Sequence, residues 1–177
     1  GYFNKSVENL RELAKRFPGN KEIHFALIYA YIESYKFGDA KNQLSSLATE
    51  VEIRESPEYA ASLARFYTKS GNYFSAVKWL KISISKNPLS DQDYYMLADL
   101  YLKKRTYKEA QNYLLRAINL DPGNILYRIS YSDILFDIDN AETALGYIRE
   151  ALQEFPDHPA LFGQLAILYN RSGQLKQ

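Results

Sequence analysis

Residues 91–124 read DQDYYMLADLYLKKRTYKEAQNYLLRAINLDPGN, and this stretch decides the fold. Large and small apolar residues of its first half recur at i, i+3, i+4 and i+7, and they are Tyr94, Leu97, Ala98 and Tyr101. This spacing predicts an amphipathic helix over residues 91–104. A matching stripe in the second half consists of Ala110, Leu114, Ala117 and Ile118 and predicts a partner helix over about residues 107–120. The closing DPGN ends that helix, so the stretch predicts a helical hairpin.

The same chemistry returns along the chain with a period of 34 residues. Three alanines keep this interval, Ala76, Ala110 and Ala144. Three prolines keep it twelve residues further on, Pro88, Pro122 and Pro156. Small residues and a closing proline in fixed phase predict stacked helical hairpins, because one hairpin cannot bury its apolar face without a neighbour.

Laying out the sequence in this register divides it into repeats. Residues 1–20 form a second-helix half repeat, residues 21–56, 57–90, 91–124 and 125–158 form full repeats, and residues 159–177 form a first-helix remnant. This division predicts one all-α array of stacked antiparallel hairpins with about ten helices. Because both ends fall inside a repeat, we expect the chain to be a fragment of a larger protein. Two extra residues near positions 51–56, where no proline closes the repeat, predict a looser hairpin over residues 21–56.

The bend between the two helices of a repeat holds glycine at Gly71 and Gly173. Glycine adopts the left-handed conformation that follows many helix ends without a steric penalty. Tyr35 and Arg105 stand at the same bend in two other repeats. Those two turns are therefore either built differently or mildly strained.

The phased positions resemble the tetratricopeptide repeat family over essentially the whole chain. The clearest matches are Leu63-Ala64, Tyr67, Gly71-Asn72-Tyr73, Ala76, Leu80 and Pro88, and then Tyr94, Leu97-Ala98, Tyr101, Tyr107, Ala110, Leu114, Ala117 and Pro122. The chain departs from the family pattern at Ser83, Asp139 and Ala141. The resemblance implies a right-handed α-solenoid, in which first helices line a concave groove and second helices form the convex back.

Composition excludes several classes of function. The 22 Lys and Arg residues nearly balance the 21 Asp and Glu residues, and the formal net charge of +1 gives no footprint of a nucleic-acid binder. Without cysteine, disulfides, thiolate nucleophiles and cysteine zinc sites are excluded. No apolar run approaches the ~18 residues that a membrane span needs.

The sequence offers no catalytic constellation, and it predicts no enzyme, no cofactor and no metal. The two histidines are far apart, and we interpret His24 as a packing residue with a satisfied ring and His158 as a turn or capping residue. Asp133, Asp137 and Asp139 form the densest carboxylate group, which we interpret as a solvated patch because nothing nearby would shift a pKa. Glycine-rich phosphate loops and nucleophile elbows are absent. Most of the 16 tyrosines fall on packing positions of the repeats.

The resemblance implies that a ligand occupies the groove, so the candidate site consists of first-helix positions that face away from the second helix. These residues are Phe25, Tyr29, Arg65, Lys69, Tyr95, Asp99, Lys103, Asp133, Phe136 and Asp137. Along the chain, this predicted surface is first aromatic (Phe25, Tyr29), then basic (Arg65, Lys69, Lys103), and finally acidic beside an apolar ring (Asp133, Asp137 and Phe136). Aromatic anchors with both signs of charge suit an extended peptide or a partner helix.

We therefore expect a non-catalytic scaffold that binds a peptide or partner protein in its concave groove and works within a multiprotein assembly. Bacterial members of the family often serve in secretion or envelope assembly, which makes such an assembly one expected setting. The alternatives are a recognition or regulatory segment of a larger enzyme and, less in keeping with the charge, an RNA-binding helical repeat. The helix expected over residues 159–172 would present four apolar residues and allow self-association, and they are Leu161, Leu165, Leu168 and Tyr169.

Overall fold

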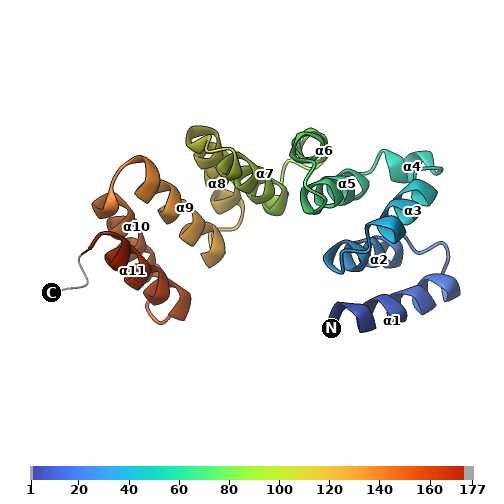
Figure 1. The fold of residues 1–177 in the computed structure, drawn as a ribbon, viewed down its shortest axis with the longest axis horizontal. Coiled ribbons are helices and arrows are strands. Elements are labelled where there is room, and N and C mark those ends of the chain that lie inside the picture. The colour runs from blue at the N-terminus through green and yellow to red at the C-terminus, as the bar shows by residue number, and fades with distance from the viewer. Residues whose placement is uncertain (1, 174–177) are drawn as a thin grey trace. The chain divides into compact units, whose positions relative to one another are not determined.

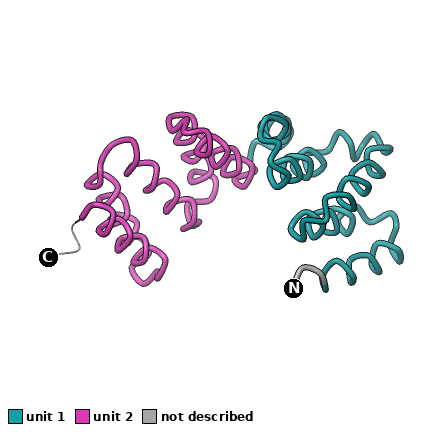
Figure 2. The backbone as a smooth tube through the Cα atoms, in the orientation of Figure 1, with its two compact units in different colours: residues 1–89 teal, residues 90–177 magenta. Residues whose placement is uncertain are grey.

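The structure of the chain is a computed structural model that describes residues 2–173. Within those residues it contains eleven α-helices and no β-strand. The helices divide into two compact units, residues 1–89 and residues 90–177 (Figure 2). The all-α fold of helical hairpins expected from the period of 34 is thus confirmed.

Unit 1 contains six helices (Figure 1). They are α1 (Tyr2–Arg16), α2 (Lys21–Glu33), α3 (Phe37–Leu47), α4 (Val51–Arg54), α5 (Pro57–Lys69) and α6 (Tyr73–Lys86). Helix α2 packs against α1, α3 and α5, while α5 and α6 pair as a hairpin. Asn20, Ser56 and Asn72 cap α2, α5 and α6, since each side chain accepts a hydrogen bond from a backbone N–H of the first turn. These caps fix where the helices begin.

Unit 2 contains five helices, α7 (Asp91–Lys103), α8 (Tyr107–Leu120), α9 (Ile125–Ile138), α10 (Ala141–Glu154) and α11 (Pro159–Arg171). The predicted helices over residues 91–104 and 107–120 are confirmed as α7 and α8. Ala98 of α7 and Ala110 of α8 are buried together with Leu114, so small residues bring the two helices into close contact. The same small position is buried again at Ala144 on α10.

The prediction of about ten helices is confirmed, and residues 2–173 contain one more short helix than the repeat register gives. The additional helix is α4, a single turn of four residues at the place of the two extra residues near positions 51–56. With no proline to end the repeat, the chain makes this turn before Pro57 begins α5, and the turn buries Ile53 against the core of unit 1. The insertion is therefore a packed element.

The bends at Tyr35 and Arg105 are strained rather than built differently. Their φ angles are 59° and 58°, in the same left-handed region as Gly71 at 82° and Gly173 at 74°. A side chain in this region costs about 1–2 kcal/mol relative to the right-handed conformation. Asp139, at the corresponding place after α9, has a φ of −103°, so the bend of this repeat is made without a left-handed residue.

Replacing Arg105 with glycine is expected to raise the free energy of unfolding by about 1 kcal/mol, because relief of the left-handed strain exceeds the entropy that glycine adds to the unfolded chain. Urea denaturation measures this change. Gly71→Ala is the reciprocal control, because it places a side chain on a residue with the left-handed conformation. A Cβ at Gly71 meets no atom within 4 Å, so any loss of stability comes from the backbone alone. Equal stabilities of the Arg105→Gly and wild-type proteins would contradict the interpretation of strain.

Helix α11 presents different residues from those expected. Leu161 and Leu168 are fully buried, and Leu165 and Tyr169 pack partly buried in the same cluster, which also includes residues of α9 and α10. The expectation that these four are presented was wrong, because a first helix turns this stripe toward the preceding repeat. The large apolar residues that α11 exposes are instead Phe162 and Ile167. None of the described helices combines the length and the apolarity that crossing a membrane requires.

His24 lies at a packing position and His158 at the start of a helix. His24 contacts the Pro18 carbonyl through Nε2 at 2.8 Å and the Gln43 side-chain nitrogen through Nδ1 at 2.9 Å. Both ring nitrogens thus have partners, which confirms the interpretation of His24 as a satisfied packing residue. His158 is the N-cap residue of α11, but its side chain makes no capping hydrogen bond.

Candidate functional site

In unit 1, the first-helix surface joins α2 to α5 through one carboxylate. Glu33 of α2 accepts a hydrogen bond from Lys69 Nζ at 2.8 Å and lies 4.0 Å from Arg65 Nη1. The guanidinium of Arg65 also lies over the ring of Tyr29, 4.9 Å from its centroid. Two cations predicted to bind a ligand therefore already contact Glu33.

Glu33 sets the electrostatics of this part of the surface. Its side chain is only 14% exposed, and its hydrogen bond is the main cause that raises the pKa of Lys69 above the usual value. Phe25, a further predicted site residue, is half-buried and packs against the core of unit 1. In unit 1 the predicted site thus holds neighbouring first helices together and leaves Tyr29 as its exposed aromatic residue.

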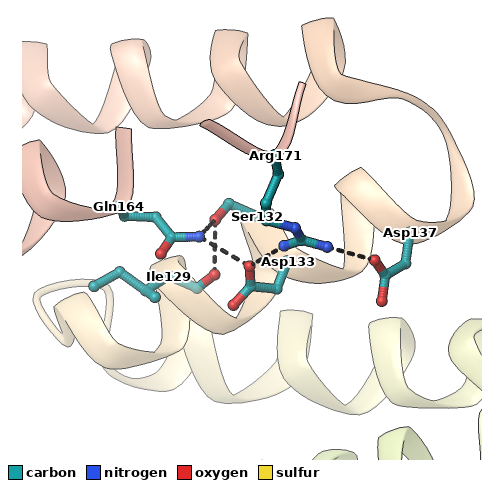
Figure 3. Close-up of polar contacts among 6 residues, drawn as sticks. All are labelled: Ile129, Ser132, Asp133, Asp137, Gln164 and Arg171. Carbon is teal, nitrogen blue, oxygen red and sulfur yellow. Dashed lines mark hydrogen bonds and ion pairs between the residues drawn. The ribbon is translucent and has the colours of Figure 1, made fainter. Parts of the chain in front are cut away.

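In unit 2, Arg171 of α11 holds two carboxylates of α9 (Figure 3). Its Nη1 donates to Asp133 Oδ1 at 2.8 Å and its Nη2 donates to Asp137 Oδ1 at 2.7 Å. The guanidinium also lies 3.9 Å from the centroid of the Phe136 ring. Three predicted site residues are therefore brought together by one arginine, and the interpretation of the acidic group as merely solvated was incomplete.

Gln164 provides a second support for the same carboxylates. It is buried on α11, and its Nε2 donates to Asp133 Oδ1 at 2.9 Å and to Ser132 Oγ at 3.0 Å. Ser132 in turn donates to the carbonyl of Ile129 at 2.7 Å. Figure 3 shows Gln164 and Arg171 reaching Asp133 from the same helix, so the orientation of this carboxylate is fixed by α11.

Tyr95 of α7 stacks on Tyr127 of α9, with ring centroids 4.8 Å apart and an interplanar angle of 29°. Its hydroxyl lies 3.4 Å from Ser130 Oγ. Tyr127 is buried and donates to Asp91 Oδ2 at 2.6 Å. Burial, and then this hydrogen bond, raise the pKa of Tyr127 above the usual value for a phenol. Tyr95 therefore packs between first helices rather than standing free.

The raised pKa of Tyr127 predicts a loss of stability in alkali. Above pH ~10 the unfolded chain releases this proton and the folded chain keeps it, so unfolding becomes easier by up to about 1.4 kcal/mol per pH unit. Tyr127→Phe is expected to cost about 1 kcal/mol at pH 7 through the lost hydrogen bond, and this deficit should shrink above pH 10. Urea midpoints of both proteins from pH 7 to 11 measure it. A constant deficit over this range would contradict the prediction.

A hollow of about 520 Å³ lies in unit 2 where the end of α7, the start of α8 and the middle of α9 meet. It is lined by Leu102, Lys103, Arg105, Tyr107, Asp133, Ile134 and Asp137. Lys103 Nζ lies 2.6 Å from Asp99 Oδ2 on the same helix. Three predicted site residues, Lys103, Asp133 and Asp137, thus share one concave surface.

The residues that line this surface can contact a ligand by charge and by apolar packing. Across residues 2–173, no three His, Cys, Asp or Glu side chains are grouped as metal ligands. The cations line one side of the hollow from α7 and the bend after it, and the carboxylates line the other from α9. Such a surface can fix the position and direction of a bound chain segment.

The sequence predicted which residues share the first-helix surface but not which of them pair. Arg105, Tyr107 and Gln164 were not predicted to take part, and for the first-helix positions Glu33 and Arg171 the pairing was not predicted. A signal was present, because one register position holds Glu33 and Lys69 in adjacent repeats of unit 1 and Asp137 and Arg171 in adjacent repeats of unit 2. Opposite charges at the same position of neighbouring repeats indicate ion pairs between first helices.

Comparisons with known proteins agree with this architecture. A family model described as tetratricopeptide repeat matches residues 94–124. The chain is 28% identical over 112 residues to the TPR repeat-containing protein MJ1428 of Methanocaldococcus jannaschii. That match covers 62% of this chain and 19% of the relative, so the chain matches less than a fifth of the relative's length.

Two solved structures share the fold at low sequence identity. TTC0263, a thermophilic TPR protein of Thermus thermophilus, superposes with a TM-score of 0.76 at 15% identity, covering 94% of this chain and 90% of that one. A tetratricopeptide repeat protein of Parabacteroides merdae ATCC 43184 has a TM-score of 0.73 at 16% identity, covering 97% of this chain and 68% of that one. At these identities the likeness concerns the fold.

Proposed function

The chain is a tetratricopeptide-repeat protein, and from this premise we propose that it is a non-catalytic scaffold that binds a peptide or partner-protein segment on its first-helix surface, within a multiprotein assembly. Repeats of this family generally mediate interactions between proteins, and proteins built from them are generally non-catalytic. Fold alone does not select a ligand, so the proposal depends on the surface itself.

The observation that supports the proposal is the hollow in unit 2. Its volume of about 520 Å³ lies within the range of binding pockets, roughly 300–1,000 Å³. Its lining combines apolar side chains, a tyrosine and both signs of charge. Apolar and aromatic contacts supply affinity, and charges select the orientation of a segment.

The carboxylates of the hollow are also held in place before any ligand arrives. Arg171 and Gln164 fix Asp133, and Arg171 fixes Asp137. Side chains that are already ordered lose little conformational entropy on binding, which favours affinity. The support from α11 therefore favours recognition at this place over a surface of freely moving side chains.

A test begins with peptides selected from a random display library on the full chain. The best peptide is titrated into isotope-labelled protein, and amide shifts are followed by NMR. We expect the shifts to concentrate on Lys103, Arg105, Asp133 and Asp137. Shifts concentrated on the outward faces of α8 and α10 would contradict the proposal.

A matched pair of variants checks the mapping. Lys103→Ser lies in the hollow and is expected to weaken binding of the selected peptide. Arg116→Ser removes an exposed cation from the second helix α8 and is expected to leave the affinity unchanged. Equal affinities of the two variants would place the ligand elsewhere.

A further inference from the structure

Arg105 stands where glycine would be the less strained residue. It adopts a φ of 58° at a bend whose counterparts in two other repeats are Gly71 and Gly173. Its side chain lines the hollow and has no carboxylate within ion-pair distance among residues 2–173. Strained backbone positions cluster at binding sites, so a strained residue whose guanidinium has no ion pair among residues 2–173 is a candidate for contact with a ligand.

The opposite side of the hollow carries an unbalanced negative charge. Asp133 and Asp137 share the single guanidinium of Arg171, and both contact it through Oδ1. Gln164 also donates to Oδ1 of Asp133. The Oδ2 atoms of both carboxylates accept no hydrogen bond from the part of the chain that the structure describes, so two acceptor oxygens remain on one face of α9.

Lys103 differs from Arg105 in its surroundings. Its ammonium is 2.6 Å from Asp99, which offsets its charge. The guanidinium of Arg105 can instead offer two parallel N–H donors to a carboxylate. Leu102 and Ile134 supply the apolar part of the lining between the charged groups.

We infer that the hollow recognises a peptide segment that carries one acidic and one basic side chain, the acidic one bound by Arg105 and the basic one by Asp133 and Asp137. This inference rests on the proposed function and names its partner by chemistry. Each charge of the segment meets the opposite charge that the hollow leaves unbalanced, and reversing the segment would bring like charges together. The hollow therefore selects the direction of the bound segment as well as its composition.

The inference is tested by selecting random dodecapeptides on three full-length proteins, wild type, Arg105→Gly and Tyr35→Gly. Both substitutions relieve a left-handed bend, and only Arg105 lines the hollow. On the wild type and on Tyr35→Gly we expect enriched peptides with an acidic and a basic residue at a fixed spacing. On Arg105→Gly the acidic preference should disappear, and the best wild-type peptide should bind about tenfold more weakly.

Thermal unfolding separates this loss from damage to the fold. Arg105→Gly is expected to have a melting temperature above that of the wild type, so weaker binding by this variant reflects the missing guanidinium and not damage to the fold. Asp137→Asn, whose amide oxygen can still accept from Arg171, tests the other side of the hollow. It should reduce binding of the same peptide, and it should have a smaller effect on a peptide whose basic residue is replaced by glutamine.

The outcomes distinguish the two proposals. If no peptide is enriched on the wild type, peptide recognition and the inference both fail. If peptides are enriched and map to the hollow but lack the paired charges, or bind Arg105→Gly as tightly as wild type, the inference alone is overturned. Rescue of Arg105→Glu by a peptide whose acidic residue is changed to lysine would support the inference directly.

Discussion

Replacing Leu114 with alanine is expected to lower the free energy of unfolding by about 3 kcal/mol. Leu114 lies on α8, is fully buried, and belongs to a cluster that also includes Ala98, Tyr127 and Ile134. The cluster joins α7, α8 and α9, so a cavity at this position weakens two interfaces at once. Urea denaturation of the full chain, followed by circular dichroism, measures the loss.

Leu115 provides a matched control on the same helix. Its side chain is 37% exposed, so Leu115→Ala removes the same atoms from a solvent-exposed position. It should lower the free energy of unfolding by less than about 1 kcal/mol. Because repeats contact chiefly their neighbours, the Leu114 variant should also lose amide protection first in α7, α8 and α9. Similar losses from both substitutions would contradict the packing described here.

Replacing Arg128 with alanine is expected to cost a similar amount, about 3 kcal/mol. The Arg128 side chain is 10% exposed and donates to Glu154 through Nη2 at 2.6 Å and to the Pro122 carbonyl through Nε at 2.9 Å. Its guanidinium also lies over the ring of Phe155. Truncation removes a link between the start of α9, the end of α10 and the preceding turn, and it leaves the Pro122 carbonyl without this donor.

Two further variants identify the cause of that loss. Arg116→Ala removes an exposed arginine of α8 and should change stability by less than about 0.5 kcal/mol. Glu154→Gln keeps the shape of a partner that is 56% exposed and should cost about 1 kcal/mol. If Arg128→Ala were no worse than Arg116→Ala, the network around Arg128 would have no structural role.

The sequence predicted the hairpins because their signals are local. The apolar stripes of residues 91–124 and the proline that closes each repeat depend only on helical periodicity and turn chemistry, and α7 and α8 follow them closely. Helix α4 was missed because its four residues are too short to show a period. The apolar stripe of α11 was expected to be presented and is instead packed against α9 and α10, because periodicity identifies a face but not what covers it.

The candidate site was predicted as a set of positions and not as a set of contacts. Register placed Arg65 and Lys69 on a first helix of unit 1 and Asp133 and Asp137 on a first helix of unit 2, which needs only the repeat period. Their pairing with Glu33 and Arg171 depends on distances between helices and on rotamers, which a single sequence does not encode locally. The strain at Arg105 was one of two interpretations left open by the missing glycine, and only the backbone angle decided between them.

The ion pairs between first helices give each unit an elasticity that depends on salt. Glu33 and Lys69 join α2 to α5, and Asp137 and Arg171 join α9 to α11, beside apolar clusters that hold the hairpins and also join neighbouring repeats. At 0.1 M ionic strength the screening length is about 10 Å and shortens further as salt is added, so the charged links weaken first. Raising the ionic strength should therefore soften the contacts between neighbouring first helices, while the apolar clusters that also join those repeats stay in place.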